Sequence, residues 1–145
     1  MMNVIVVGAG IVGSSVAYRV AQGGAKVTVL EADRIGGGTS GVSFAWTNSN
    51  NKTPRPYHDL NVAGMRAHAA LKEEFGATPW FHQSGSLEWR VGPAEIAAQA
   101  EKVARLRDWG YAAEFIDKKR LGVLEPEIAL DAVPDNAQIV FCPEE

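Results

Sequence analysis

Three glycines near the start of the chain form the pattern that most directly indicates chemistry. They stand in the hexapeptide Gly8-Ala9-Gly10-Ile11-Val12-Gly13. In such a turn the first glycine permits a tight bend, the second lets a phosphate approach the backbone, and the third lets the following helix pack closely on the strand. Glu31 follows eighteen residues after Gly13. A carboxylate there can accept hydrogen bonds from both hydroxyls of an adenosine ribose and would repel a 2′-phosphate. The spacing therefore predicts a dinucleotide site.

The elements on either side of this turn are the ones that such a site requires. Residues 4–7 are an unbroken β-branched apolar run, which is typical of a parallel strand buried on both faces. The helix after the turn directs its free N–H groups and the positive end of its dipole at the phosphates. Ala17 is small enough to face the sheet, Gly23 and Gly24 end the helix, and residues 27–30 form a second strand. The first thirty residues thus predict a β-α-β unit.

A second glycine-rich stretch lies in a long segment, residues 32–56, that has no helical or strand periodicity. Structureless loops longer than about 12–15 residues are uncommon in compact domains unless they have a function. Residues 36–41, with the hydroxyls of Thr39 and Ser40, offer a second surface for phosphate or ribose. Residues 44–52 mix large apolar groups, including Trp46, with amides and one cation, which suits the edge of a flat heterocycle. A flexible linker is the alternative for this segment.

The rest of the chain alternates helices and strands. The patterns predict helices over residues 56–75, 93–109 and 118–124, and strands over residues 84–91, 113–116 and 138–142. We expect these later strands to be antiparallel and to belong to a second layer. Three tryptophans are expected to pack in a core: Trp80, Trp89 and Trp109.

Composition narrows the class of protein. The net charge is only −3 and the 14 basic residues are scattered, so no nucleic-acid or anionic-membrane surface is expected. Cys142 is the single cysteine, which excludes an internal disulfide and fits a reducing, cytoplasmic location. His58, His68 and His82 lack histidine partners at helical spacing, so no metal site is expected. No apolar run reaches the ~20 residues that span a bilayer, so we expect no integral membrane segment.

Taken together, GAGIVGSSVAYRVAQGGAKVTVLEAD, then GGGTSGVSFAW, then SGSLEW, LEPEI and the terminal FCPEE resemble the amino-terminal part of the FAD-dependent D-amino-acid oxidase family, near its glycine oxidase and D-amino-acid dehydrogenase branch. The resemblance implies an α/β chain in which a Rossmann-like FAD-binding βαβ unit is followed by the start of an α+β substrate domain. The fold would be incomplete, with residues 1–78 in the FAD-binding domain and 79–145 in a partial substrate domain.

The resemblance also implies a cofactor, a reaction and a set of binding residues. The cofactor would be FAD. Some branches of the family attach the flavin covalently through a histidine in the loop after the second strand, and this loop has none, so noncovalent binding is expected. The substrate would be an amino acid or small amine, oxidised at its C–N bond by hydride transfer to flavin N5. The residues that would bind FAD lie in the two glycine stretches, around the acid and in the following loop: Gly8, Gly10, Ile11, Val12, Gly13, Glu31, Ala32, Thr39, Ser40, Phe44, Ala45 and Trp46.

Several alternatives stay open at this stage. Glu31 equally permits a nicotinamide-dependent dehydrogenase, although the long loop after it argues against one. The third interpretation is a non-catalytic, truncated dinucleotide-binding fragment. We expect these 145 residues to be inactive alone, because activity would require a carboxyl-terminal part or a partner chain. Asn48, Lys52 and Arg55 could lie near the flavin or be ordinary loop residues, and no catalytic acid, base or nucleophile is assigned.

Overall fold

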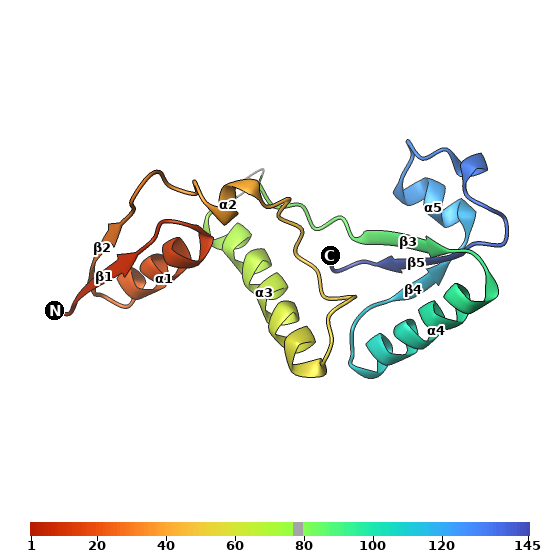
Figure 1. The fold of residues 1–145 in the computed structure, drawn as a ribbon, viewed down its shortest axis with the longest axis horizontal. Helices are drawn as coiled ribbons and strands as arrows, with labels where there is room; N and C mark the ends of the chain where they lie inside the picture. The colour runs from red at the N-terminus through yellow and green to blue at the C-terminus, as the bar shows by residue number, and fades with distance from the viewer. Residues whose placement is uncertain (77–79) are drawn as a thin grey trace. The chain divides into compact units, whose positions relative to one another are not determined.

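The structure is a computed structural model that describes residues 1–76 and 80–145. It divides into two compact units, residues 1–45 and residues 46–145. Both units are drawn in Figure 1. The predicted domain boundary between residues 78 and 79 lies outside the described residues, so the division into a FAD-binding and a substrate domain stays a prediction.

The first unit is built on two parallel strands and the helix that connects them. Strand β1 (Asn3–Val7) pairs in register with β2 (Lys26–Leu30), and helix α1 (Ile11–Gln22) lies beside both strands (Figure 1). Ala17 is the buried residue of α1, as its small side chain predicts. The helix ends at Gly23, and Gly24 takes a left-handed φ of 87°. The predicted β-α-β unit is confirmed.

Glycine is required where α1 meets β1. A Cβ atom on Gly13 would lie 2.0 Å from the carbonyl oxygen of Gly8, far inside van der Waals contact. Gly8 itself has a φ of 100°, a region that L side chains rarely adopt. The first and third glycines of the turn therefore have the steric roles that the motif predicts.

The long loop after β2 is not wholly irregular, contrary to the prediction. It contains a one-turn helix, α2 (Thr39–Val42), between Gly38 and Ser43. Four residues cannot carry an apolar stripe, so periodicity gives no signal for a helix this short. The remainder of the loop leads to helix α3 (Arg55–Glu74).

The second unit centres on a three-stranded antiparallel sheet. Its strand order is β3 (Ser86–Arg90), β5 (Gln138–Cys142) and β4 (Glu114–Ile116), so the last strand in sequence lies in the middle. Helices α4 (Pro93–Asp108) and α5 (Lys118–Leu124) and the 3₁₀ turn η1 (Leu130–Ala132) complete the unit. The predicted antiparallel arrangement of these later strands is confirmed.

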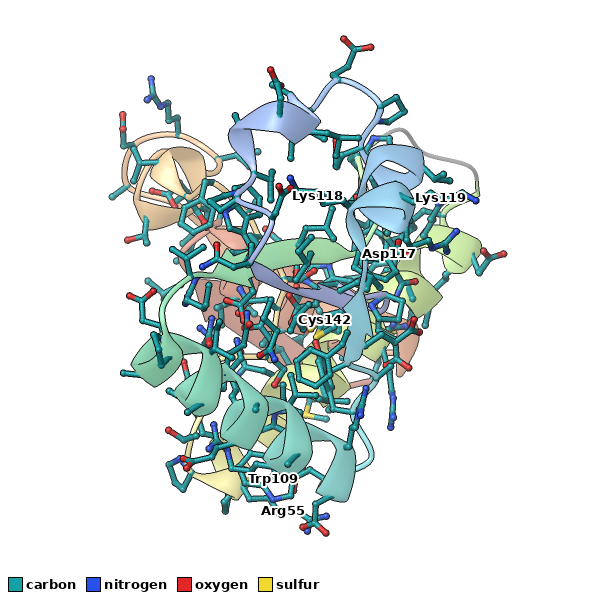
Figure 2. All side chains as sticks on the ribbon, turned by 90° about the vertical axis from the view of Figure 1, so that its right-hand side faces the viewer. Arg55, Trp109, Asp117, Lys118, Lys119 and Cys142 are labelled. Carbon is teal, nitrogen blue, oxygen red and sulfur yellow. The ribbon has the colours of Figure 1, made fainter. Side chains whose placement is uncertain are left out.

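Alternating residues of β5 supply two cores on opposite faces of this sheet. Val140 and Cys142 face α4, where they pack with Met65 of α3, and Ile139 faces α5, where it packs with Leu121. Figures 1 and 2 show the sheet between α4 and α5, with Cys142 on the central strand. In Figure 2 Asp117 lies at the start of α5, whose first turn it caps by accepting a hydrogen bond from the Arg120 N–H at 2.7 Å.

Two of the three predicted core tryptophans are substantially exposed. Trp80 keeps 48% and Trp89 37% of its surface accessible, whereas Trp109 is half-buried at the end of α4 (Figure 2). The prediction was wrong for Trp80 and Trp89, because residue type alone does not say which neighbour covers a ring.

Candidate dinucleotide-binding site

The first unit carries a groove of about 550 Å³ beside the glycine turn. Its floor is the end of β1 and the first turns of α1, and one wall is the second glycine stretch. The groove brings together seven of the twelve predicted FAD-binding residues: Gly8, Gly10, Val12, Gly13, Glu31, Thr39 and Ser40.

The amino-terminal end of α1 faces this second glycine stretch. Gly10, the residue before the helix, has no side chain to cap it, so the first N–H groups need partners from elsewhere. The Ile11 N–H donates to Ser40 Oγ at 2.9 Å, and a Cβ on Gly10 would lie 3.0 Å from the same hydroxyl. Ser40 thus lies at the helix end where a pyrophosphate is expected to bind.

Glu31 lies on the rim of the groove, held by backbone donors. Its Oε2 accepts a hydrogen bond from the Ala9 N–H at 2.8 Å and its Oε1 one from the Asp33 N–H at 3.1 Å. These bonds, the Ala9 one foremost, lower the pKa of the Glu31 carboxyl below its usual value. A carboxylate has about four lone-pair sites, so acceptor capacity remains for ribose hydroxyls.

The two glycine stretches have the same local geometry. In each, a glycine with positive φ lies three residues before a helix, and the glycine five positions later is the third helical residue. A Cβ on Gly41 would lie 2.5 Å from the Gly36 carbonyl oxygen, as one on Gly13 would lie 2.0 Å from that of Gly8. The Gly36 N–H also donates to the Ala9 carbonyl at 3.0 Å, which joins the two turns directly.

The remaining predicted residues lie outside the groove lining. Ala32 follows Glu31 on the surface, and Phe44 is 85% exposed. Ala45 has a φ of 54°, a left-handed conformation that costs a residue with a Cβ on the order of 1–2 kcal/mol. Trp46 begins the second unit with 46% of its surface exposed. Strained backbone conformations such as that of Ala45 concentrate at ligand-binding sites.

The three side chains that the sequence placed near a flavin make local contacts. The Asn48 Nδ2 donates to the Trp46 carbonyl at 3.2 Å, and the Lys52 ammonium lies 5.9 Å from the Tyr57 ring centroid. Arg55 pairs with Asp59 at 3.6 Å across one turn of α3. These contacts assign no chemical role to the three residues.

Sequence reasoning gave Ala9 no role of its own, and it named Gly37 and Gly38 only as part of the stretch 36–41. Ala9 is buried, holds Glu31 through its N–H and holds Gly36 through its carbonyl, and both Gly37 and Gly38 line the groove. The repeated glycine-x₄-glycine spacing at 8–13 and 36–41 was the available signal that the two stretches form similar turns.

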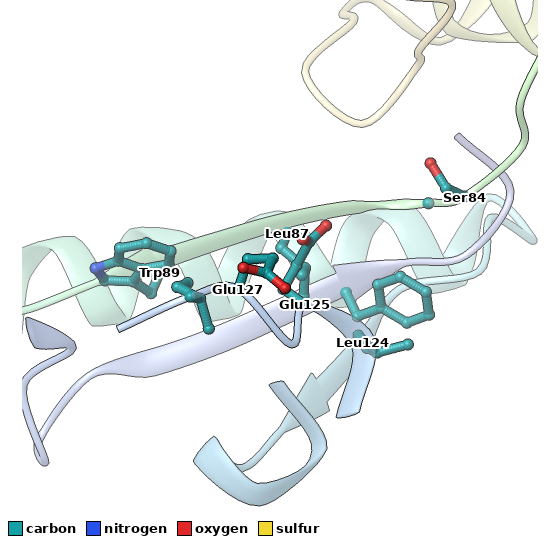
Figure 3. Close-up of a pocket in the computed structure, with 9 residues that line it drawn as sticks. Ser84, Leu87, Trp89, Leu124, Glu125 and Glu127 are labelled. Carbon is teal, nitrogen blue, oxygen red and sulfur yellow. The ribbon is translucent and has the colours of Figure 1, made fainter. Parts of the chain in front are cut away.

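A second groove, of about 440 Å³, lies on the sheet of residues 46–145 (Figure 3). Leu87 and Trp89 of β3 line it, together with Glu125 and Glu127 from the segment after α5. No glycine turn or helix start of the kind seen in the first unit lines it, so the candidate cofactor site is the groove of residues 1–45.

The described residues contain neither a membrane-spanning helix nor a cluster of metal-ligand side chains. Within residues 1–76 and 80–145, no helix is long and apolar enough to cross a membrane. In the same part of the chain, no three histidine, cysteine, aspartate or glutamate side chains come together as metal ligands.

Residues 3–145 match the family model described as FAD dependent oxidoreductase. The chain therefore belongs to this FAD-dependent oxidoreductase family, as its two glycine turns and Glu31 predict. It is also 28% identical over 148 residues to the uncharacterized oxidoreductase YurR of Bacillus subtilis (strain 168), covering 97% of this chain and 38% of that protein.

Solved structures share the fold. The glycine oxidase from Geobacillus kaustophilus superposes with a TM-score of 0.78 at 18% identity, over 99% of this chain and 40% of that one. The glycine oxidase from Bacillus cereus gives 0.75 at 21% identity, with 99% and 39% covered, and L-proline dehydrogenase from P. horikoshii gives 0.67 at 22%, with 99% and 37% covered. The chain thus spans about two fifths of the length of these proteins, and its α/β fold is a part of theirs.

Proposed function

We propose that this chain supplies the ADP-binding part of an FAD-dependent oxidoreductase that acts on the C–N bond of an amino acid or small amine. The observation that carries the proposal is the direct joining of two glycine turns at one groove, through Gly36 N–H to Ala9 and Ile11 N–H to Ser40, with Glu31 on its rim. A single glycine turn with an acid would suit NAD equally well, whereas the second turn adds a wall that a long FAD cofactor can use.

The residues present fit the adenosine and pyrophosphate portions of the cofactor. Gly8 and Gly38 have open space where a Cβ would stand, so a ligand can approach the backbone closely there. The helix end favours the pyrophosphate, and the ionised Glu31 favours two free ribose hydroxyls over a 2′-phosphate. The proposed role of the chain is to bind and orient the cofactor. It does not include a residue that transfers a proton.

When bound, FAD supplies the acceptor for the hydride that leaves the substrate carbon, and the resulting imine is hydrolysed by water. Phe44, Ala45 and Trp46 would then border the isoalloxazine edge, as the resemblance implies. Glycine oxidase and L-proline dehydrogenase among the structural relatives support an amino acid or cyclic amine as the substrate class. We expect turnover to require residues that correspond to the remaining three fifths of those proteins.

Titration of the purified chain with FAD, ADP and NADH in parallel tests this proposal. We expect FAD and ADP to bind, FAD more tightly, and the 145 residues alone to show no amine-dependent turnover. A Glu31→Gln variant should weaken both ligands, and Gly64→Ala, far from the groove in sequence and with nothing within 4 Å of its Cβ, should weaken neither. Preference for NADH would favour a nicotinamide-dependent dehydrogenase, and no binding at all would favour a non-catalytic fragment.

A further inference from the structure

Glu145 is an acidic residue buried in the interior of the second unit, with 6% of its surface exposed. Its carboxylate accepts five hydrogen bonds. Oε1 receives the Ser49 N–H at 3.1 Å, the Asn50 N–H at 2.9 Å and the Tyr111 hydroxyl at 2.5 Å. Oε2 receives the Asn50 Nδ2 at 2.7 Å and the Ser86 hydroxyl at 2.5 Å.

These donors come from segments that are distant in the sequence. Ser86 begins β3, Tyr111 follows α4, and the segment 49–50 belongs to the loop before α3. A buried carboxylate is tolerated only when donors replace its water, and here five do so. An amide in place of the carboxylate keeps one acceptor oxygen but turns an NH₂ group toward donors, so at least two of the five buried donors lose their acceptor.

Neighbouring side chains fix the same segment. The Ser49 hydroxyl donates to the His58 carbonyl at 2.9 Å, and His58 Nδ1 lies 3.0 Å from the Ser49 carbonyl oxygen. Lys102, which also pairs with Glu88, donates to Asn51 Oδ1 at 3.3 Å. Burial lowers the pKa of the Lys102 ammonium. Three consecutive residues of the loop are therefore held by the unit that contains the sheet.

We propose that Glu145 is a positioning residue for the flavin-binding segment. Trp46 precedes Ser49 by three residues, which span at most about 10 Å. The loop carrying Trp46 is thus tethered within that reach of a rigid anchor, and pre-ordering a loop lowers the cost of binding a ligand. The inference rests on the proposed contact of Phe44, Ala45 and Trp46 with the isoalloxazine ring.

The test separates the two ends of the cofactor. ADP engages only the glycine turns and Glu31, whereas FAD also engages the 44–46 segment. We expect Glu145→Gln to reduce FAD affinity about tenfold and to leave ADP affinity within about twofold of wild type. In hydrogen exchange, the amides of residues 49–51 should lose protection in this variant.

Control variants distinguish positioning from general loss of stability. Glu144→Gln changes an exposed neighbouring acid, and Ile139→Val loosens the core on the opposite face of the sheet; both should keep the wild-type affinity for FAD. If Glu145→Gln does not fold, Glu145→Asp, which keeps the charge but withdraws it by one methylene, carries the same prediction with a smaller loss.

The outcomes have distinct meanings. If the Glu145 variants bind FAD as much more tightly than ADP as the wild type does, this inference alone is overturned. It is also overturned if Ile139→Val loses as much FAD affinity as Glu145→Gln. Wild-type protein that binds FAD no more tightly than ADP overturns both the proposed flavin contact and the role of Glu145.

Discussion

Replacing Gly13 with alanine tests the geometry on which the whole first unit depends. The new Cβ would lie 2.0 Å from the Gly8 carbonyl oxygen, and Cβ atoms essentially never approach another atom within 3.0 Å. Helix α1 must therefore move away from β1 by roughly 1 Å, because the atom in its way is backbone and cannot rotate aside. The displacement carries the amino-terminal end of α1 away from the turn that is proposed to hold the pyrophosphate.

The expected magnitude combines two opposing terms. Overpacking of this kind costs about 1–3 kcal/mol, while alanine in place of a helical glycine gains about 0.5–1 kcal/mol. The net loss of stability should therefore lie between about 0 and about 2.5 kcal/mol. Gly64→Ala is the matched control, since Gly64 lies within α3 with nothing within 4 Å of its Cβ. It should show only the gain of about 0.5–1 kcal/mol.

The assay must report on residues 1–45. All four tryptophans of the chain lie in residues 46–145, so tryptophan fluorescence follows the wrong unit. Hydrogen exchange of the α1 amides and calorimetric titration with ADP are the suitable measurements. Gly13→Ala should weaken ADP at least about tenfold, equivalent to about 1.4 kcal/mol. Wild-type ADP affinity together with unchanged α1 protection would refute the reasoning.

Three further predictions concern single groups. Backbone donors, Ala9 first, lower the pKa of Glu31, so the affinity for FAD, whose diester pyrophosphate does not titrate in this range, should stay level from pH 8 to pH 5. Glu31→Gln should weaken ADP about tenfold while reducing discrimination against 2′-phosphorylated ADP, and calorimetry measures both effects. Burial raises the pKa of the Cys142 thiol from 9.0 to about 11; the unfolded thiol loses its proton first, so stability should fall by about 2–3 kcal/mol as the pH rises through that range, and urea unfolding should show a shallower fall in Cys142→Ala. Ala45→Gly should relieve the left-handed φ of 54° and stabilise the chain by up to about 1 kcal/mol in urea unfolding, a gain that a relaxed Ala45 would not show.

Local patterns were sufficient to predict most of the elements. The β-branched run before Gly8, the small Ala17 and the glycine pair after α1 each act within one or two turns of chain, so their effects can be derived without knowing the fold. The same holds for β5, where alternation over residues 138–142 places Val140 and Cys142 on one face and Ile139 on the other.

Contacts between residues far apart in the sequence were beyond such reasoning. Ser40 meets Ile11 across 29 positions, and Glu145 meets Asn50 across 95. The residue type of a serine in a glycine-rich loop, or of an acid after a strand, does not identify its hydrogen-bond partner. The same side chain can bond to water or to a buried protein group. The exposed ring of Trp89 shows the converse, since its apolar character predicted burial without supplying a neighbour to cover it.

The repeated glycine turn depends on both local sequence and long-range contacts. Gly8 and Gly13 are recognisable because a helix must leave a buried strand at close range, and the same steric condition recurs at Gly36 and Gly41 around a helix of only four residues. So short a helix has little stability of its own, since its nucleation costs more than one turn of hydrogen bonds returns. Its order must therefore come from Gly36 bound to Ala9 and from Ser40 bound to Ile11. The second turn is ordered by its hydrogen bonds to the first. Glycine spacing alone therefore predicts the first turn more securely than the second.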